Sequence, residues 1–209
     1  MAANALSAET IAELLSRPAP PPAPEDSRMA FIPAGVSVTD AAVMVPLVHR
    51  PQGLHVLLTQ RTDHLSDHGG QVSFPGGRVE SADVSREETA LRETEEEIGL
   101  ARAHVRILGR LPQYEIPTGF RITPVVGWVE PPFDLKLDPF EVASAFEVPL
   151  PHFLDLGSYQ RREYRFGGRH RHYMAIPFEG RYIWGATAGM LYSLACMLHG
   201  DATGIREPR

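Results

Sequence analysis

The feature that most constrains the fold is a carboxylate-rich segment that follows a glycine pair, Gly76-Gly77. Ser85 and Glu88 form an S-x-x-E capping box at the start of this segment, and Gly99 provides a left-handed stop at its end. These signals predict a helix over about residues 86 to 98.

The expected helix has two faces of different chemistry. Residues three and four apart are neighbours on a helix, so Glu93, Glu96 and Glu97 share one face. Glu95 points elsewhere. Like charges at that spacing destabilise an isolated helix by about 0.2–0.5 kcal/mol per pair, and a multivalent cation compensates for them. An acidic face exposed to solvent is the alternative interpretation. The packing arc, separate from the acidic face, consists of Ala90, Leu91, Thr94 and Ile98.

Donors that are all oxygens indicate a hard divalent cation, Mg²⁺ or Mn²⁺. We expect Glu93, Glu96 and Glu97 to be the metal ligands, with Gly77 allowing a close approach of the backbone and lending its carbonyl. Arg92 is expected to hold a carboxylate in place by a charge-assisted hydrogen bond. A solvent-exposed helix salt bridge is the alternative for this arginine.

The same segment resembles the Nudix box, whose general form is G-x5-E-x7-R-E-U-x-E-E-x-G-U with U aliphatic. The chain departs from it in two places. Asp83 stands where a glutamate is expected, with one extra residue before Arg92, and Thr94 takes an aliphatic position. Together with the upstream run over residues 57–77, the segment is similar to the coenzyme A diphosphatase subfamily of Nudix hydrolases. The combined resemblance covers residues 57–100.

The resemblance implies an α/β (α+β) fold, the Nudix-type α/β/α sandwich with a mixed β-sheet and the Nudix loop-helix-loop. The Nudix hydrolase domain is expected over residues 30–209, after an N-terminal helix and a proline-rich linker in residues 1–29. The pattern predicts strands at 41–48 and 55–61, joined by a hairpin turn. Further strands are expected at 105–108, 122–129 and 173–177, and helices at 6–15 and 187–198.

The implied reaction is the Mg²⁺- or Mn²⁺-dependent hydrolysis of the diphosphate bond of coenzyme A or its derivatives, which gives 3′,5′-ADP and 4′-phosphopantetheine or its acyl form. Glu93 and Glu141 are the candidates for the base that deprotonates water, and an ordinary surface glutamate is the alternative for Glu141. Arg61 and Arg78 are expected to bind the 3′-phosphate or else to pair with acids. Gln71 is expected to hydrogen-bond the substrate, unless the backbone satisfies its carboxamide.

Other functions stay open within and beyond this chemistry. The substrate could be another nucleoside diphosphate derivative such as ADP-ribose. An isomerase of related fold relies on a cysteine, which the chain offers only at Cys196, in an apolar segment typical of a core. A non-catalytic nucleotide-sensing module would typically have a damaged box, whereas the three key glutamates and Arg92 are intact.

Composition limits the partners. The net charge of −6 disfavours binding to nucleic acid and to anionic membranes. No apolar run approaches the length of a membrane span and no secretory signal is visible, so we expect a cytoplasmic protein with a small-molecule substrate. The resemblance suggests a homodimer. A basic hairpin over residues 161–172 is either a solvated ribbon or a contact for a phosphate or a partner subunit.

Overall fold

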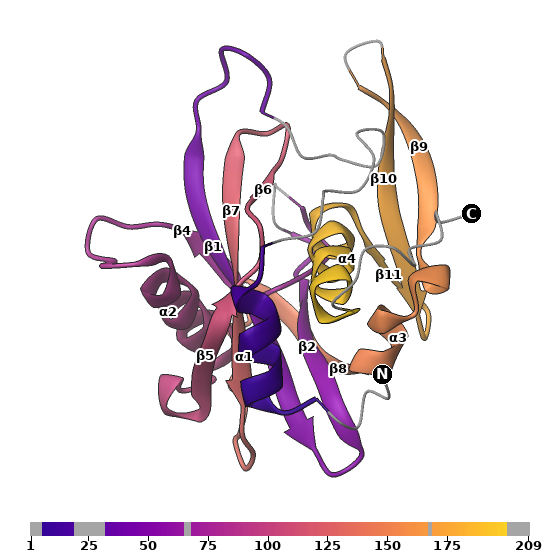
Figure 1. Cartoon of the computed structure of the whole chain (residues 1–209). Coiled ribbons are helices and arrows are strands. Elements are labelled where there is room, and N and C mark those ends of the chain that lie inside the picture. Colours follow the sequence, from indigo (N-terminus) through magenta and orange to yellow (C-terminus); the bar gives the residue numbers. More distant parts are fainter. Residues whose placement is uncertain (1–5, 19–31, 65–67, 167–168, 200–209) are drawn as a thin grey trace.

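The computed structural model describes residues 6–18, 32–64, 68–166 and 169–199. These residues form a mixed structure of helices and strands around one large sheet (Figure 1). The helices are α1 (Ala8–Ser16), α2 (Arg86–Ile98), α3 (Leu150–Leu154) and α4 (Gly185–His199). Single 3₁₀ turns span Arg102–His104 and Leu156–Ser158.

The large sheet is mixed. Its strands are β1 (Thr39–Arg50), β2 (Gly53–Arg61), β3 (Val72–Ser73), β4 (Gly76–Arg78), β5 (Val105–Arg110), β6 (Tyr114–Glu115), β7 (Phe120–Val129) and β8 (Val142–Pro149). The main order is β3-β2-β1-β7-β5, with β4, β6 and β8 paired to β1, β7 and β2. β1 and β7 run parallel, whereas β1 and β2 form the expected antiparallel hairpin.

A second sheet has three antiparallel strands in the order β11-β10-β9. The strand predicted at 173–177 lies inside β10, and the expected basic hairpin is the β9–β10 pair. The side chains of four of its residues lie outside the described part of the structure. The strands are β9 (Gln160–Phe166), β10 (Arg169–Phe178) and β11 (Arg181–Trp184).

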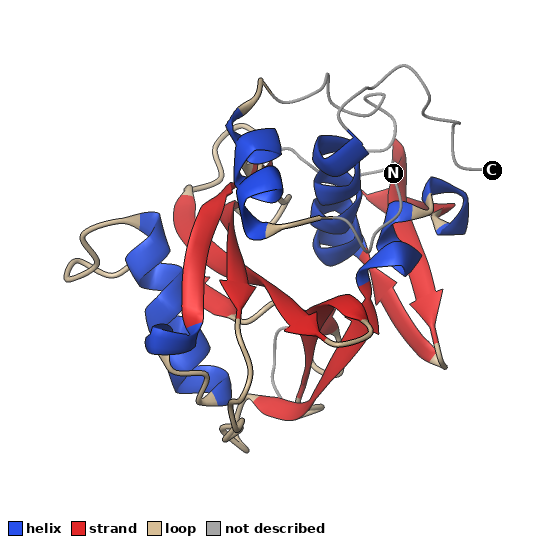
Figure 2. Cartoon of the chain, turned by 60° about the horizontal axis from the view of Figure 1, so that its bottom comes forward, coloured by secondary structure: helices blue, strands red, loops and turns tan. Residues whose placement is uncertain are grey.

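Figure 2 shows α2 on one face of the large sheet and α1 and α4 on the other. Successive side chains of β2 point to opposite faces of the sheet, so the strand packs against the helices on both sides. Leu54, Val56 and Leu58 point to the side of α4, and all three belong to the largest buried cluster. Leu57 points to the opposite face and packs with Ile98 of α2. The expected α/β/α sandwich is therefore confirmed.

Helix α1 joins the main core. Its side-chain cap is Ser7, and the buried Ile11 and Leu14 face the sheet and α4. Leu15 lies against Gly109 of β5, where a Cβ would approach it to 3.1 Å. The small residue at this position allows the helix to pack closely on the strand. The proline-rich linker predicted to follow α1 lies in residues 19–31, outside the described residues.

The terminal helix predicted over 187–198 is confirmed by α4, which is buried along almost its whole length. Cys196 is buried in it, and burial raises the pKa of the thiol to about 11. The cysteine therefore fills the core, as expected, and is unsuited to act as a nucleophile at neutral pH. No helix within the described ranges is long and apolar enough to cross a membrane.

Candidate active site

The carboxylate-rich segment forms the helix expected from its caps. Ser85 Oγ accepts a hydrogen bond from the Glu88 backbone N–H at 3.2 Å, and Gly99 adopts a left-handed conformation with φ of +68°. Glu95 turns away from the other glutamates and pairs with Arg102, with 3.1 Å between Oε2 and Nε. The predicted bounds of 86 and 98 are those of α2.

The glycine pair places the helix directly against the sheet. Gly76 and Gly77 belong to β4 and pair with Val43 and Ala42 of β1. A Cβ at Gly77 would collide with the carboxylate of Glu93, and a Cβ at Gly76 would collide with the Ala42 carbonyl oxygen. Gly76 needs glycine because its φ of +156° and the β1 backbone leave no room for a side chain, whereas a side chain at Gly77 would displace the Glu93 carboxylate.

Glu97 is the most buried of the three expected metal ligands, with its side chain 4% exposed. Gly76 donates its backbone N–H to Glu97 Oε2 at 3.4 Å, and Arg61 Nη1 lies 3.7 Å from Oε1. Burial raises the pKa of Glu97 to about 8, although Arg61 opposes the shift, and the charges of Glu141 and Glu93 add to it. A buried carboxylate with so little compensation is a position that a cation stabilises.

The burial of Glu97 corrects one expectation from the sequence. The acidic arc and the packing arc of α2 were expected to be separate, but Glu97 is buried in the same way as Thr94 and Ile98. The reason is that α2 lies beside β4 with its acidic side partly turned toward the sheet. Glu96, by contrast, is 60% exposed.

Glu93 and Glu141 lie close enough to influence each other. The side chain of Glu93 is largely buried, with 16% exposed, and burial raises its pKa, with Glu96 and Glu141 contributing in the same direction and Arg92 opposing. Glu141 lies immediately before β8, in a loop attached to the end of β2 by a 3.0 Å hydrogen bond from the Thr62 N–H to the Glu141 carbonyl. Strand pairing between β2 and β8 thus brings a residue distant in sequence to the end of α2.

Arg61 lies between two of these acids. Its Nη1 is 3.7 Å from Glu97 Oε1, and its Nη2 is 3.8 Å from Glu141 Oε2. The side chain is 23% exposed, so the guanidinium is partly enclosed by the cluster. This position agrees with the alternative that Arg61 pairs with acids, and it leaves part of the residue facing solvent.

Arg92 organises the opposite side of the cluster. Its Nη1 donates to Glu93 Oε1 at 3.0 Å and to Glu96 Oε2 at 3.1 Å. Its Nε and Nη2 donate to the two carboxylate oxygens of Asp83. Arg92 therefore binds three acids at once and is not an exposed helix salt bridge, which is consistent with its expected role of holding a carboxylate in place.

Asp83 is a buried hydrogen-bond acceptor for three groups around the loop before α2, a role that the spacing of the segment did not predict. Its side chain is 5% exposed, and besides Arg92 it accepts hydrogen bonds from the Glu80 N–H and the Thr89 hydroxyl, both at 2.9 Å. These hydrogen bonds, led by that from Arg92, hold the pKa of Asp83 well below its usual range. The extra residue of the box is accommodated in this loop, and the pairing of Asp83 with Arg92 was not predicted from the spacing.

The other two expected substrate contacts lie at the edges of the cluster. Arg78 is exposed, and its guanidinium carbon lies 5.3 Å from the centre of the Phe120 ring, while its carbonyl accepts from Arg92 at 3.1 Å. Gln71 Oε1 lies 3.0 Å from His68 Nδ1, and the residue lines a cleft of about 350 Å³. Gln71 is thus paired through its side chain as well as through its backbone.

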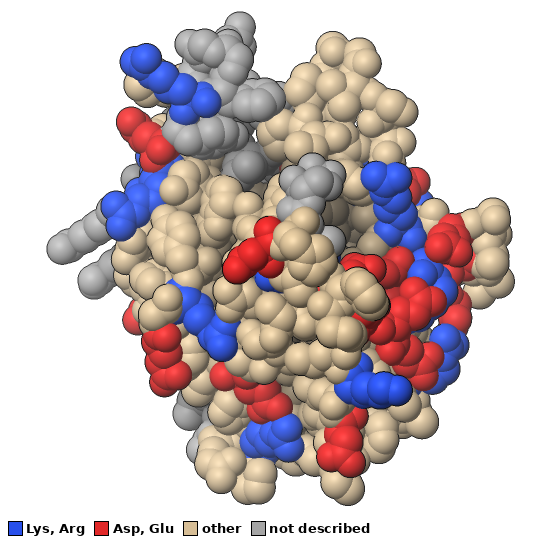
Figure 3. Space-filling model, turned by 180° about the vertical axis from the view of Figure 1, so that it is seen from behind, with Lys and Arg blue, Asp and Glu red and all other residues tan. Residues whose placement is uncertain are grey.

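The donor set fits a divalent cation. On the rear face, acidic side chains gather over α2 with arginines among them (Figure 3). All the donors are carboxylate or carbonyl oxygens, which suit Mg²⁺ or Mn²⁺. Among the described residues, no three His, Cys, Asp or Glu side chains form a group that could hold a metal ion as they stand, and Arg92 and Arg61 lie against the carboxylates. The chemistry of the donors fits the ion, whereas their arrangement is not that of a formed metal site.

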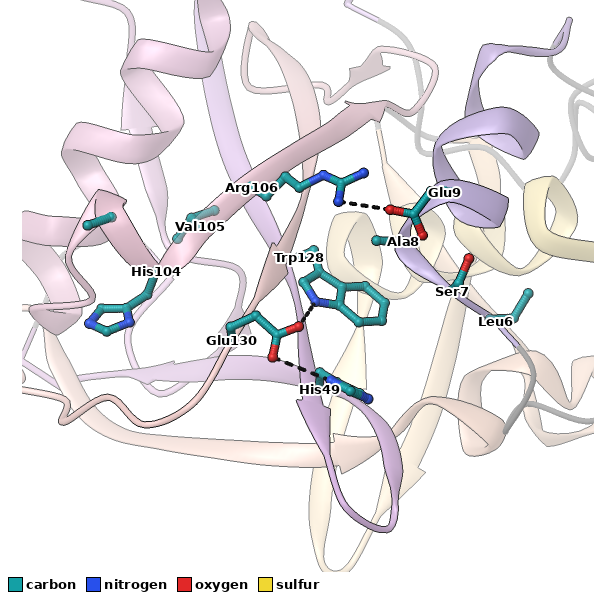
Figure 4. A pocket seen from close by; sticks show the side chains of 11 residues that line it. Leu6, Ser7, Ala8, Glu9, His49, His104, Val105, Arg106, Trp128 and Glu130 are labelled. Atoms are coloured by element: carbon teal, nitrogen blue, oxygen red, sulfur yellow. Dashed lines mark hydrogen bonds and ion pairs between the residues drawn. The ribbon is translucent and has the colours of Figure 1, made fainter.

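A larger cavity lies elsewhere. It has about 550 Å³ and is lined by α1, β5 and the far ends of β1 and β7 (Figure 4). His49 on its wall is seven residues along β1 from Ala42, the partner of Gly77. At about 3.3 Å per residue, the two positions are about 23 Å apart. The cavity is therefore separate from the carboxylate cluster.

Two comparisons with known sequences indicate one family. A model described as the NUDIX domain matches residues 38–145. A relative from Escherichia coli strain K12, called "Uncharacterized Nudix hydrolase NudL", is 44% identical over 160 residues, which cover 76% of this chain and 82% of the relative. Among solved structures, a Caenorhabditis elegans Ap4A hydrolase binary complex matches with 22% identity and a TM-score of 0.46, over 55% of this chain and 82% of that one. The NUDIX domain of Shewanella oneidensis NrtR, complexed with ADP ribose, matches with 22% identity and a TM-score of 0.44, over 59% and 81%.

Proposed function

Because the chain belongs to the Nudix family and is a Nudix hydrolase, we propose that it hydrolyses the diphosphate bond of coenzyme A or its derivatives. The products are 3′,5′-ADP and 4′-phosphopantetheine, or acyl-phosphopantetheine from an acylated substrate. The observation that carries the proposal is the meeting of two segments. Arg61, in the run similar to coenzyme A diphosphatases, lies against Glu97 of the Nudix helix and against Glu141.

Mg²⁺ or Mn²⁺ would be held by the carboxylates of Glu93, Glu96 and Glu97 together with the Gly77 carbonyl. When bound, the ion supplies positive charge to the diphosphate and acidifies water beside it. Gly77 leaves the space beside the Glu93 carboxylate free of any side chain.

The protein's own groups orient the acids and move the proton. Arg92 fixes one oxygen each of Glu93 and Glu96, so that their remaining oxygens point away from the guanidinium. Glu93 is supported as the proton acceptor by its position, because its carboxylate lies beside the side-chain-free Gly77 and only one of its oxygens is bound by Arg92 Nη1. Glu141 is the second candidate because it adjoins the cluster and is 46% exposed, within reach of substrate water. Separate Glu93→Gln and Glu141→Gln variants distinguish the two, because only loss of the true base removes the rise of the rate with pH that its deprotonation causes.

We assign Arg61, Gln71 and Arg78 to substrate binding. Coenzyme A carries a 3′-phosphate that a cation recognises. Arg78 is supported by its exposure at the rim, and Arg61 by its place between the acids and solvent. The check compares coenzyme A with 3′-dephospho-coenzyme A. Arg78→Ala should raise KM for the first substrate and leave KM for the second unchanged, and an equal rise for both would remove the 3′-phosphate assignment.

The main experiment is product analysis after incubation of the protein with coenzyme A or ADP-ribose, each with Mg²⁺, Mn²⁺ or a chelator. Metal-dependent release of 3′,5′-ADP and 4′-phosphopantetheine, faster than the cleavage of ADP-ribose, is expected. Cleavage of ADP-ribose alone would contradict the assignment of coenzyme A and retain diphosphate hydrolysis. No cleavage of either substrate, with binding of both, would favour a sensing module.

We also propose that the enzyme acts as a cytoplasmic homodimer. The support is the resemblance to other Nudix hydrolases. Light scattering on the eluting protein should give twice the chain mass of 23.1 kDa. A mass of one chain across the working concentrations would contradict the dimer.

A further inference from the structure

A cleft of about 350 Å³ is lined by residues of both sheets. One wall comes from the large sheet, with Gln60 and Gln71, and from the loop that contains Gly69 and Gly70, here called the glycine loop. The other wall comes from β11, with Arg181, Tyr182 and Trp184. Arg181 and Tyr182 lie outside the segments over residues 57–100 that carry the main resemblance, which has only a weaker continuation at Trp184. The cleft therefore combines residues of those segments with residues that the fold brings to them.

The two walls are fixed to each other by direct contacts. Arg181 Nη1 donates to Gln60 Oε1 at 2.6 Å and to Ser144 Oγ at 3.4 Å. The Arg181 guanidinium also lies 3.9 Å from the centre of the Phe146 ring of β8. Gln60 Nε2 donates in turn to the Gly70 carbonyl at 3.4 Å. These contacts connect β2, β8, β11 and the glycine loop, so the cleft is a formed feature of the fold.

The cleft adjoins the carboxylate cluster. The Arg61 backbone N–H donates to the Gln71 carbonyl at 2.9 Å, and Gln60 is the residue before Arg61. The side chain of Arg61 reaches Glu97 and Glu141. A single residue thus hydrogen-bonds to the wall of the cleft through its backbone and lies within ion-pair distance of the cluster through its side chain. A substrate whose diphosphate lies at the cluster has one end within reach of the cleft.

The chemistry of the cleft suits a planar heterocycle. Tyr182 is 44% exposed, and its hydroxyl lies 3.4 Å from that of Tyr173. Trp184 packs edge-on against Tyr173, with 5.3 Å between ring centres. Aromatic faces stack on nucleobases, and a carboxamide such as that of Gln71 pairs with the donors and acceptors on a base edge. The volume is at the low end for small-molecule sites and so fits one end of a substrate.

We propose that this cleft is the nucleobase subsite of the enzyme, in which Tyr182 and Trp184 contact the face of a purine and Gln71 its edge. The role of the subsite in catalysis rests on the proposed hydrolysis of a nucleoside diphosphate derivative. The binding of a nucleobase in the cleft does not depend on that function. The larger cavity is a weaker candidate for this role. Its wall at His49 lies about 23 Å along β1 from Ala42, the partner of Gly77, and none of its lining residues belongs to the carboxylate cluster.

Tryptophan fluorescence tests the subsite without any reaction. The chain has two tryptophans, so a Trp128→Phe background leaves Trp184 as the reporter. Titration with AMP in the absence of a divalent metal should quench this signal in a saturable way. In the same background, Tyr182→Ala should weaken AMP binding by at least about tenfold, whereas Tyr182→Phe, which keeps the ring, should bind within about threefold of its parent.

Three results would overturn the subsite: no saturable quenching by AMP, equal binding by the Tyr182→Ala variant, or quenching by pantetheine and not by AMP. Circular dichroism of each variant shows whether the fold is retained, and Tyr182→Phe provides the matched control. Failure of the subsite and failure of the proposed function are distinguishable. AMP binding without hydrolysis of any diphosphate would contradict the function alone, and metal-dependent hydrolysis without Tyr182-dependent AMP binding would contradict the subsite alone.

Discussion

Arg92 binds Asp83 in a bidentate ion pair, with Nε 3.0 Å from Oδ1 and Nη2 3.0 Å from Oδ2. The pair attaches the loop after β4 to the middle of α2, nine residues later. Because the same guanidinium also holds Glu93 and Glu96, the loop and the glutamates share one anchor. The geometry of the carboxylate cluster therefore depends on a residue that is not itself an expected metal ligand.

Replacement of Asp83 should disturb the carboxylate cluster indirectly, through Arg92. Asp83→Asn removes the charge that binds Arg92 and frees the guanidinium to bind the glutamates more tightly. We expect a loss of about 1–3 kcal/mol in the free energy of unfolding and a fall in turnover of about tenfold or more. Denaturant unfolding and turnover of coenzyme A measure the two effects. Glu80→Gln is the control, since Glu80 is 64% exposed and lies 3.9 Å from Arg92. Equal effects of the two substitutions would contradict the role of Asp83.

Among the glutamates over residues 93–97 of α2, Glu97 should support catalysis and Glu95 should not. Glu97→Gln should reduce turnover by at least about 100-fold, because the cluster loses a buried carboxylate that is positioned to compensate a cation. Glu95→Gln should keep nearly full turnover, since Glu95 pairs with Arg102 away from the cluster. Binding of Mn²⁺, followed by electron paramagnetic resonance, gives a readout apart from activity. Full Mn²⁺ binding and turnover in the Glu97 variant would rule out the metal assignment.

The ion pair between Glu87 and Arg110 predicts a pH dependence of stability. Arg110 donates to Glu87 through Nε at 2.5 Å and Nη2 at 2.7 Å, and these bonds lower the pKa of Glu87 from 4.5 to about 2. A lowered pKa in the folded state means that the stabilisation is complete above pH 4.5 and is lost as the pH falls toward 2. Because the pair is partly exposed, its contribution is about 1 kcal/mol.

Glu87→Gln should therefore lower the free energy of unfolding at neutral pH and have little effect near about pH 2. Denaturant titrations at several pH values measure the difference between this variant and the parent. Glu13→Gln is the control, because Glu13 is 69% exposed and pairs with Arg17 at the end of α1. A difference that is constant with pH would contradict the ion-pair explanation.

The N-terminal helix should contribute to the stability of the whole unit. Ile11 is fully buried where α1 contacts β5 and α4, so Ile11→Ala should cost about 2–5 kcal/mol in the free energy of unfolding. Glu13→Ala, on the exposed side of the same helix, should cost only about 0.5 kcal/mol, from the loss of its pair with Arg17. For Ile11→Ala, we expect a single cooperative unfolding transition whose midpoint is lower than that of the parent protein and of Glu13→Ala. An unchanged midpoint would show that α1 is detachable from the hydrolase domain.

Several elements could be predicted from the chain because their signals are local. The Ser85 cap and Gly99 set the two ends of α2, and the turn before Gly53 set the β1–β2 hairpin, with hydrogen bonds between near neighbours. The Glu88 carboxylate pairs with Arg102, so within the described part of the chain the second half of the expected capping box is not seen. The strand β8 and the short β11 were not identified, since neither has a clear alternation of apolar and polar residues. Their positions depend on pairing with β2 and β10, and β2 is remote from β8 in sequence.

The amino-acid sequence by itself determined the acidic helix, its glycine neighbour and the family that the two indicate, because side chains three and four apart on a helix must share a face. Only the tertiary structure decided how deeply each acid is buried. Glu97 turns toward β4 while Glu96 stays in solvent, and Arg61 arrives from β2 to lie between Glu97 and Glu141. Burial and long-range pairing depend on how α2 docks on the sheet, and the local spacing of residues does not determine that docking.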